Sequence, residues 1–276
     1  MKQERVLQSG QERISAAFSG VGADRAAALM PYYTLGYPDR ETSLAVVEAI
    51  APYSDLLELG VPFSDPLADG PTIQHSTQAS LAAGTTTAGC LEMVRELRDR
   101  GITTPFLLMG YYNPILAYGV EQYVQDAAAA GADGFIVPDL PPEEAGDLDQ
   151  AASEAGLALI HFLAPTTSPT RMKTVARRGR GFIYLVSVTG VTGARTHISE
   201  SLASFVARVR QQTDTPLAVG FGISTPEQAA QVGAIADGVI VGSALINAVD
   251  GAEDKAAEAV RFVQALRVSL QVDRTP

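Results

Sequence analysis

The chain has 276 residues, of which 46% are hydrophobic, and carries a formal net charge of −11 at pH 7. This length is enough for one large core. The acidic balance argues against nucleic acids and anionic membranes as partners, because both need a basic surface. A single cysteine, Cys90, excludes an internal disulfide, and we expect it to be a small buried side chain. Residues 1–20 are unlike a signal peptide and no run of about 18 apolar residues predicts a membrane span, so we expect a cytoplasmic protein.

One unit repeats along the chain: a short apolar run, a loop rich in Gly, Pro or Asp, and an amphipathic helix. Apolar runs predict strands over residues 27–33, 55–59, 105–111, 134–137, 157–163, 182–186, 217–220 and 238–241. Helical spacing of apolar residues predicts helices over residues 43–51, 91–100, 121–130, 143–155, 169–178, 199–210, 226–232 and 253–270. Residues 1–25 are expected to form a further helix, at the N-terminal end of the fold.

Alternating strands and helices imply parallel strand pairing, because each helix supplies the crossover. Eight such units predict an α/β fold, a single-domain (β/α)8 TIM barrel over residues 1–276, with residues 1–10 as an N-terminal extension. The alternative is a doubly wound sheet for dinucleotide binding. It is disfavoured because the first loop, residues 34–39, lacks the glycine fingerprint of that fold. The helix within residues 1–25 is then expected to cap the bottom of the barrel.

Residues 57–71, LELGVPFSDPLADGP, carry two carboxylates in unlike settings. Glu58 stands within an apolar run that predicts a buried strand, and Asp69 lies in the loop that follows. Burial raises the pKa of a carboxyl group, which suits proton transfer near neutral pH, while a second carboxylate can stay ionised. The alternative, an outward Glu58 paired with a cation, is disfavoured by the apolar Leu57 and Leu59 beside it.

Glycines cluster after three of the late strands, at residues 190–193, 220–224 and 242–244. Glycines let backbone N–H groups approach an anion closely, and barrels frequently bind phosphate after strands seven and eight. The clusters therefore favour a phosphate site over ordinary tight turns.

Enzymes with such barrels often break or form C–C bonds, and they commonly use a lysine Schiff base or a metal ion for this. No lysine stands on a predicted strand, as a Schiff base would need, and the three histidines are too scattered to predict a metal site. We expect His161 to be a hydrogen-bonded core residue. Tyr184 either assists by hydrogen bonding or packs in the core. What remains is acid–base catalysis by carboxylates without a metal or cofactor.

Several motifs resemble, in order and spacing, the tryptophan synthase alpha subunit family over about residues 12–270. They are residues 57–74, 111–115, 181–187, 190–193, 220–224 and 242–243. The resemblance implies a barrel that cleaves indole-3-glycerol phosphate to indole and glyceraldehyde 3-phosphate in tryptophan biosynthesis. It implies no cofactor in this chain, and a pyridoxal-phosphate-dependent beta subunit as partner in an alpha2-beta2 heterotetramer.

The resemblance also implies site residues. Glu58 matches the acid/base of the family, and Asp69 matches the residue that contacts the indole N–H. The positions that match substrate-binding residues are Tyr32, Tyr184 and Thr192, and those that match phosphate-binding residues are Gly193, Gly222, Gly242 and Ser243. The family often has Phe where Tyr32 stands and a small residue where Pro138 stands.

Three alternatives stay open. A stand-alone indole-releasing lyase would have the same catalytic residues, and only its behaviour with a beta subunit would separate it. A phosphate-sugar isomerase on the same barrel would leave Asp69 and its loop unexplained. A non-enzymatic activating subunit is disfavoured by the intact Glu58 and Asp69.

Overall fold

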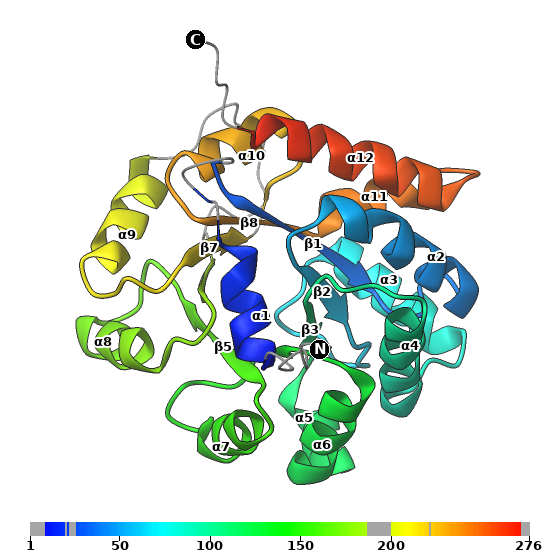
Figure 1. Cartoon of the computed structure of the whole chain (residues 1–276), viewed down its shortest axis with the longest axis horizontal. Helices are drawn as coiled ribbons and strands as arrows, with labels where there is room; N and C mark the ends of the chain where they lie inside the picture. Colours follow the sequence, from blue (N-terminus) through cyan, green and yellow to red (C-terminus); the bar gives the residue numbers. More distant parts are fainter. Residues whose placement is uncertain (1–8, 20, 22–25, 187–199, 221, 272–276) are drawn as a thin grey trace, which may run out of the picture.

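The computed structural model describes residues 9–19, 21, 26–186, 200–220 and 222–271. Eight parallel strands close into one barrel in sequence order (Figure 1). They are β1 (Ala28–Thr34), β2 (Leu57–Gly60), β3 (Phe106–Met109), β4 (Gly134–Ile136), β5 (Ala158–Leu163), β6 (Ile183–Val186), β7 (Leu217–Gly220) and β8 (Gly238–Val241). The predicted (β/α)8 TIM barrel is confirmed.

Helices surround the strands (Figure 1). They are α1 (Gly10–Ala17), α2 (Arg40–Ile50), α3 (Pro71–Ala82), α4 (Thr87–Asp99), α5 (Tyr112–Tyr118), α6 (Val120–Ala130), α7 (Gly146–Glu154), α8 (Pro169–Arg178), α9 (Glu200–Arg210), α10 (Pro226–Gly233), α11 (Ser243–Asp250) and α12 (Lys255–Ser269), with a 3-10 turn at Ala51–Tyr53. In the part of the chain that the structure describes, no helix is long and apolar enough to cross a membrane.

The predicted strands agree with the structure to within two residues at each end, but α3 and α5 were not among the predicted helices, and α11 was expected only as a helix that begins at residues 242–244. For α3 the reason is physical. Its buried face is built largely from hydroxyl side chains, Ser76, Thr77 and Ser80, so it lacks the apolar stripe that identifies an amphipathic helix. Ser76 hydrogen-bonds Thr34 at 2.7 Å and Ser80 donates to the carbonyl of Leu35 at 2.6 Å, which satisfies these buried groups.

Alternate strand residues fill the inside of the barrel. The interior cluster includes Ala28 and Met30 of β1, Leu56 just before β2, and Leu107 of β3. Side chains two residues apart on a strand share a face. The interior face therefore continues through Tyr32 on β1 and through Glu58 and Gly60 on β2, towards the carboxyl ends of the strands.

Helix α1 closes the N-terminal end of the barrel and lies across its middle in Figure 1. Ile14 and Phe18 belong to the interior cluster, and the rings of Phe18 and Phe182 lie 5.7 Å apart. The helix starts at a capping box of Ser9 and Glu12 and is much shorter than residues 1–25. The expected cap on the barrel bottom is confirmed; residues 1–8 lie outside the described part of the chain.

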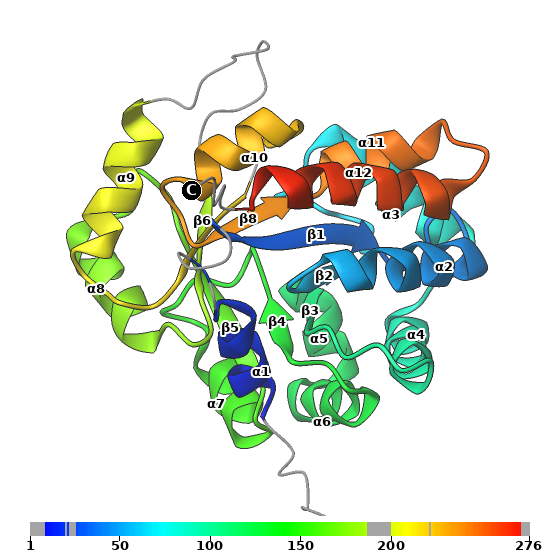
Figure 2. The same cartoon turned by 45° about the horizontal axis from the view of Figure 1, so that its top comes forward.

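The buried carboxylate of Asp133 holds helix α1 on the barrel through an ion pair. Asp133 is fully buried and pairs with Arg13 of α1 at 2.5 Å and with Arg98 of α4 at 2.7 Å. It also accepts the backbone N–H of Phe106 at 2.7 Å. The carboxyl ends of the strands lie at the opposite end of the barrel, which we call the barrel mouth. There α3 and α11 lie side by side at the carboxyl end of β1 (Figure 2).

Candidate active site

Glu58 lies inside the barrel near its open end. It is 1% exposed, and among the described residues neither carboxylate oxygen has a hydrogen-bond partner. Burial raises the pKa of this carboxyl well above its ordinary value, because the apolar surroundings disfavour the charge. Glu58 therefore holds a proton to a higher pH than an exposed glutamate does, as its sequence setting predicts.

Asp69 has a different environment, in the loop between β2 and α3. Burial raises the pKa of its carboxyl to about 6, and a hydrogen bond donated by the Tyr111 hydroxyl works in the opposite direction. The same hydroxyl accepts the N–H of Ala68 at 2.9 Å, so Tyr111 holds this part of the loop in place. At pH 7 Asp69 is mainly ionised, and the two carboxyl groups are thus suited to different roles.

Tyr111 was missed as a site residue by the sequence reasoning. It directly follows Gly110 beyond the carboxyl end of β3, a position from which barrel side chains commonly reach an active site. That position is the signal that could have identified it. Its partner in space, Asp69, is 42 residues away along the chain, so the pairing itself could not be read from the sequence.

Tyr32 and Tyr184 occupy the barrel mouth, each lying over a glycine of the next strand. A Cβ atom on Gly60 would lie 2.5 Å from Cζ of Tyr32, and one on Gly220 would lie 2.6 Å from Cζ of Tyr184. Ordinary contacts of a Cβ atom begin near 3.4 Å. The two glycines therefore leave the space that the phenol rings fill.

Both phenols stay neutral beside the carboxyl groups. Burial, then the charge of Asp69, raises the pKa of Tyr32, and burial, then the charge of Glu58, raises that of Tyr184. Tyr184 also packs against Phe162, with ring centroids 4.7 Å apart. The structure thus brings the predicted residues Glu58, Asp69, Tyr32 and Tyr184 into one cluster.

The candidate phosphate site is described in part. Gly222 has a φ of +81°, a conformation that L side chains rarely adopt. Gly242 precedes α11, whose first residue is Ser243, and no described side chain caps this helix end. The first N–H groups of a helix have no partner within it and can bind an anion. Thr192 and Gly193 lie outside the described residues.

Tyr32 links the two halves of the site. A Cβ atom on Gly242 would lie 3.4 Å from Cβ of Tyr32, which is ordinary contact. The same ring ends over Gly60, next to Glu58. Tyr32 therefore lies between Gly242 and Gly60.

The other candidate side chains lie away from this cluster. His161 faces outward from β5 and is buried, as expected, but its Nε2 atom has no hydrogen-bond partner among the described residues. His75 of α3 packs edge-on against Tyr37 at 6.2 Å. Cys90 is buried, as expected. Within the described segments, no three His, Cys, Asp or Glu side chains could together hold a metal ion.

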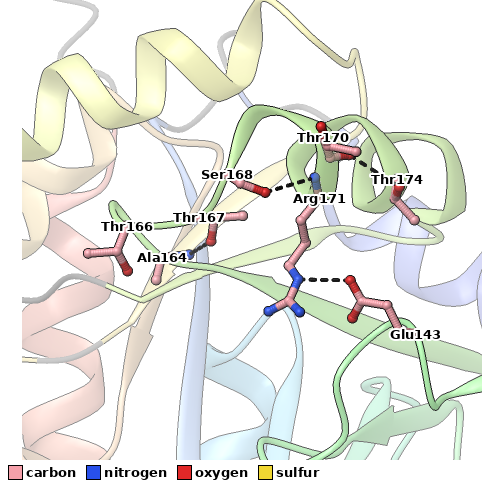
Figure 3. A pocket seen from close by; sticks show the side chains of 8 residues that line it. All are labelled: Glu143, Ala164, Thr166, Thr167, Ser168, Thr170, Arg171 and Thr174. Carbon is pink, nitrogen blue, oxygen red and sulfur yellow. Dashed lines mark hydrogen bonds and ion pairs between the residues drawn. The ribbon is translucent and has the colours of Figure 1, made fainter.

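A hollow of about 500 Å³ lies between the β5–α8 turn and Glu143 (Figure 3). Its polar side chains mostly support the turn itself. Thr167 accepts the N–H of Ala164, Ser168 caps α8, and Arg171 pairs with Glu143 at 2.9 Å. None of the residues predicted to bind substrate lines it.

The chain as a whole resembles known proteins. A family model described as "Tryptophan synthase alpha chain" matches residues 18–273. The tryptophan synthase alpha chain of Chloroflexus aurantiacus is 51% identical over 257 residues, which cover 92% of this chain and 97% of that protein. That of Geobacter sulfurreducens is 49% identical over 265 residues, covering 94% and 98%. A crystal structure of the alpha chain from Legionella pneumophila has a TM-score of 0.85 at 37% identity, and the match covers 93% of this chain and 96% of that one. The chain therefore belongs to the tryptophan synthase alpha chain family.

Proposed function

We propose that Glu58 carries the proton transfers of the reaction that this chain catalyses. That reaction is the cleavage of indole-3-glycerol phosphate to indole and glyceraldehyde 3-phosphate in tryptophan biosynthesis. The observation that carries the proposal is a buried carboxyl at the barrel mouth, with neither oxygen hydrogen-bonded by a described residue. Such a group is free to exchange a proton with a ligand.

The steps balance on one carboxyl group. Protonated Glu58 gives its proton to C3 of the indole ring, and the ring nitrogen becomes positively charged. The Glu58 carboxylate then takes the proton of the glycerol hydroxyl next to the breaking bond. As the new carbonyl forms, the electrons of the C–C bond return to the indole ring and neutralise its nitrogen. Glu58 ends as it began, protonated, which agrees with its raised pKa.

In this proposal Asp69 remains ionised and accepts the indole N–H. Its charge stabilises the positive charge that develops on the indole nitrogen. Support comes from its carboxyl being partly solvated and hydrogen-bonded by Tyr111, so that it loses its proton more readily than Glu58 does.

The remaining contacts bind the substrate. Tyr32 and Tyr184 would flank its indole and glycerol parts. The phosphate would bind to backbone N–H groups at Gly193, Gly222, Gly242 and Ser243, and Thr192 precedes Gly193 in the loop after β6. The closeness of Gly242 to Tyr32 supports this arrangement, since a Cβ atom added to Gly242 would lie 3.4 Å from Cβ of Tyr32.

We further propose that the chain holds no cofactor and works with a pyridoxal-phosphate-dependent beta subunit, in an alpha2-beta2 heterotetramer. The beta subunit would cover the barrel mouth, using Phe63, Asp65 and residues 112–115. Two of the most exposed large apolar side chains lie beside these residues: Leu67 is 93% exposed and Leu116 is 52% exposed. A covered mouth would pass the apolar indole on without release to water.

The acid–base role is tested with Glu58→Gln. Turnover of indole-3-glycerol phosphate should fall at least about a hundredfold, the usual scale for a lost general acid or base. Glu48→Gln, on the exposed face of α2, is the matched control and should keep wild-type turnover. Folding is compared by urea unfolding. A folded Glu58→Gln variant with wild-type turnover contradicts the assignment.

The partner is tested by activation and by size. We expect the loops over residues 62–71 and 189–197 to close over the substrate. A beta subunit should co-elute with the chain in gel filtration and raise its cleavage rate, because it binds the closed state of these loops more tightly. Thr192→Val should weaken this activation more than it weakens binding. Equal activation of both forms, or hydrogen-exchange protection at the α1 end of the barrel, contradicts the proposal. A chain that releases indole at full rate alone and binds no beta subunit would be the stand-alone lyase.

A further inference from the structure

The hydroxyl of Tyr32 is the first member of a buried chain of hydroxyl groups. It lies 3.2 Å from the Thr34 hydroxyl, which lies 2.7 Å from the Ser76 hydroxyl of α3. Thr34 and Ser76 are fully buried and Tyr32 nearly so. This series of hydroxyl groups therefore runs from the active-site cluster, through β1, into α3, the helix that follows the Asp69 loop.

The hydrogen bond at the far end of this series of hydroxyl groups, at Ser76, favours one direction for the others. Ser76 donates its only hydroxyl proton to the carbonyl of Ile73 at 3.0 Å. With that proton directed at Ile73, Ser76 accepts from Thr34 and Thr34 accepts from Tyr32; the oxygen positions of these two bonds fit this order as well as the reverse one. In this order the O–H bond of Tyr32 points away from the cluster, and its oxygen keeps a lone pair for a donor on the other side.

Glu58, on the neighbouring strand, is a group that can use that lone pair when it is protonated. Tyr32 and Glu58 are register partners on β1 and β2, and the Tyr32 ring crosses to lie over Gly60, two residues beyond Glu58 on the same face. In the described part of the chain, neither oxygen of Glu58 has a hydrogen-bond partner. The other titratable groups that face this space are Asp69 and Tyr184, with Tyr111 behind Asp69.

We propose that Tyr32 is a positioning residue for Glu58: the hydroxyl chain holds the phenol oxygen as an acceptor, and this oxygen takes the hydrogen bond of the protonated Glu58 carboxyl. The inference rests on the proposed role of Glu58 as the acid that protonates the substrate. A bond made only by the protonated form stabilises that form. It also keeps the carboxyl O–H in the barrel mouth, beside the substrate, before transfer.

The test is an infrared titration of the Glu58 carboxyl, whose C=O band is isolated by subtracting the spectrum of Glu58→Gln. Tyr32→Phe should lower the pH midpoint of this band by about half to one unit, since one neutral hydrogen bond to the protonated form is lost. It should also move the band to higher frequency. Tyr33→Phe removes a buried hydroxyl from the other face of the same strand, where it donates to the Tyr37 carbonyl, and should change neither quantity.

Ser76→Ala tests the direction of the hydrogen bonds between these hydroxyl groups without a change at Glu58. Thr34 can then donate to Tyr32, and the freed Tyr32 proton can turn towards the Glu58 carboxylate. The pH midpoint of the Glu58 band should therefore be lower in Ser76→Ala than in Tyr32→Phe. The variant that combines Ser76→Ala with Tyr32→Phe should have the midpoint of Tyr32→Phe alone. Urea unfolding identifies any variant that does not fold, in which case Thr34→Ser, which keeps the hydroxyl chain, should retain the wild-type midpoint.

An unchanged or raised midpoint in Tyr32→Phe overturns the proposal, as does an equal shift in Tyr33→Phe. Because the titration does not depend on turnover, the two ideas fail separately. Wild-type turnover in folded Glu58→Gln removes the role of Glu58 in cleavage. A Tyr32→Phe variant with the wild-type titration removes only the positioning role of Tyr32.

Discussion

Gly60→Ala changes the active-site cluster by one methyl group at a defined point. The new Cβ atom would lie 2.5 Å from Cζ and 2.8 Å from Cε2 of Tyr32, with the hydroxyl oxygen closer still. No other residue is among its three nearest neighbours. The substitution therefore acts on Tyr32 and tests whether the position of that ring matters.

The size of the effect follows from the distances. To reach 3.4 Å from the methyl group, where ordinary contact begins, Cζ of Tyr32 must move by about 0.9 Å, the difference from 2.5 Å. This movement breaks the bond to Thr34 and shifts the ring that flanks the substrate. Overpacking of this kind costs about 1–3 kcal/mol, from which up to about 1 kcal/mol is recovered because alanine restricts the unfolded chain. A misplacement near 1 Å can cost about a hundredfold in rate.

The assay is a double-variant cycle with Tyr32→Leu, measured by urea unfolding and by cleavage of indole-3-glycerol phosphate. Removing the ring frees the space, so Gly60→Ala should be nearly neutral for stability in the Tyr32→Leu background, with a coupling of about 1 kcal/mol or more. Gly146→Ala is the control. A Cβ there meets nothing within 4 Å, and the residue begins α7, so this variant should be unchanged or slightly more stable.

Wild-type stability and turnover in Gly60→Ala would refute the reasoning. So would a loss of stability that persists unchanged in the Tyr32→Leu background, because the methyl group would then be disturbing something other than the ring.

Other predictions concern the pH profile, the phosphate and the barrel bottom. Turnover should fall as the pH drops through about 6, because Asp69 gains a proton there, and should fall again at high pH as Glu58 loses its proton; a flat acid limb contradicts this assignment. Gly242→Asp should weaken binding of inorganic phosphate at least about tenfold in calorimetry, by adding like charge, whereas Gly251→Asp at the other end of α11 should not; equal affinities place the site elsewhere. Asp133→Ala should cost about 3–5 kcal/mol in urea unfolding, because it removes the buried charge partner of Arg98 and leaves the Nη2 group of Arg98 and the N–H of Phe106 without an acceptor. Wild-type stability in this variant would show that the cap does not depend on Asp133.

The barrel could be predicted from the sequence because its signal is local. Each strand is a short apolar run and most helices show an apolar stripe, and both patterns reflect burial of neighbouring residues against one core. The prediction failed at α3, where the buried face is made of hydroxyl groups. Ser76 and Ser80 can be buried there because Thr34, at the end of β1, and the carbonyl of Leu35, just beyond it, are their hydrogen-bond partners.

The candidate site likewise has some features that the local sequence indicates and others that depend on contacts between distant elements. Glu58 could be singled out from the sequence, because burying an acidic side chain within an apolar run lowers the stability of the fold, and a catalytic role is one reason for such a residue to be there. That Asp69 has a milder environment, that Tyr111 holds its loop, and that Tyr32 lies over Gly60 were decided only by the tertiary structure. These relations are distances between residues on different strands and loops. Closure of the barrel determines them, and no local pattern in the chain records which side chains will meet across it.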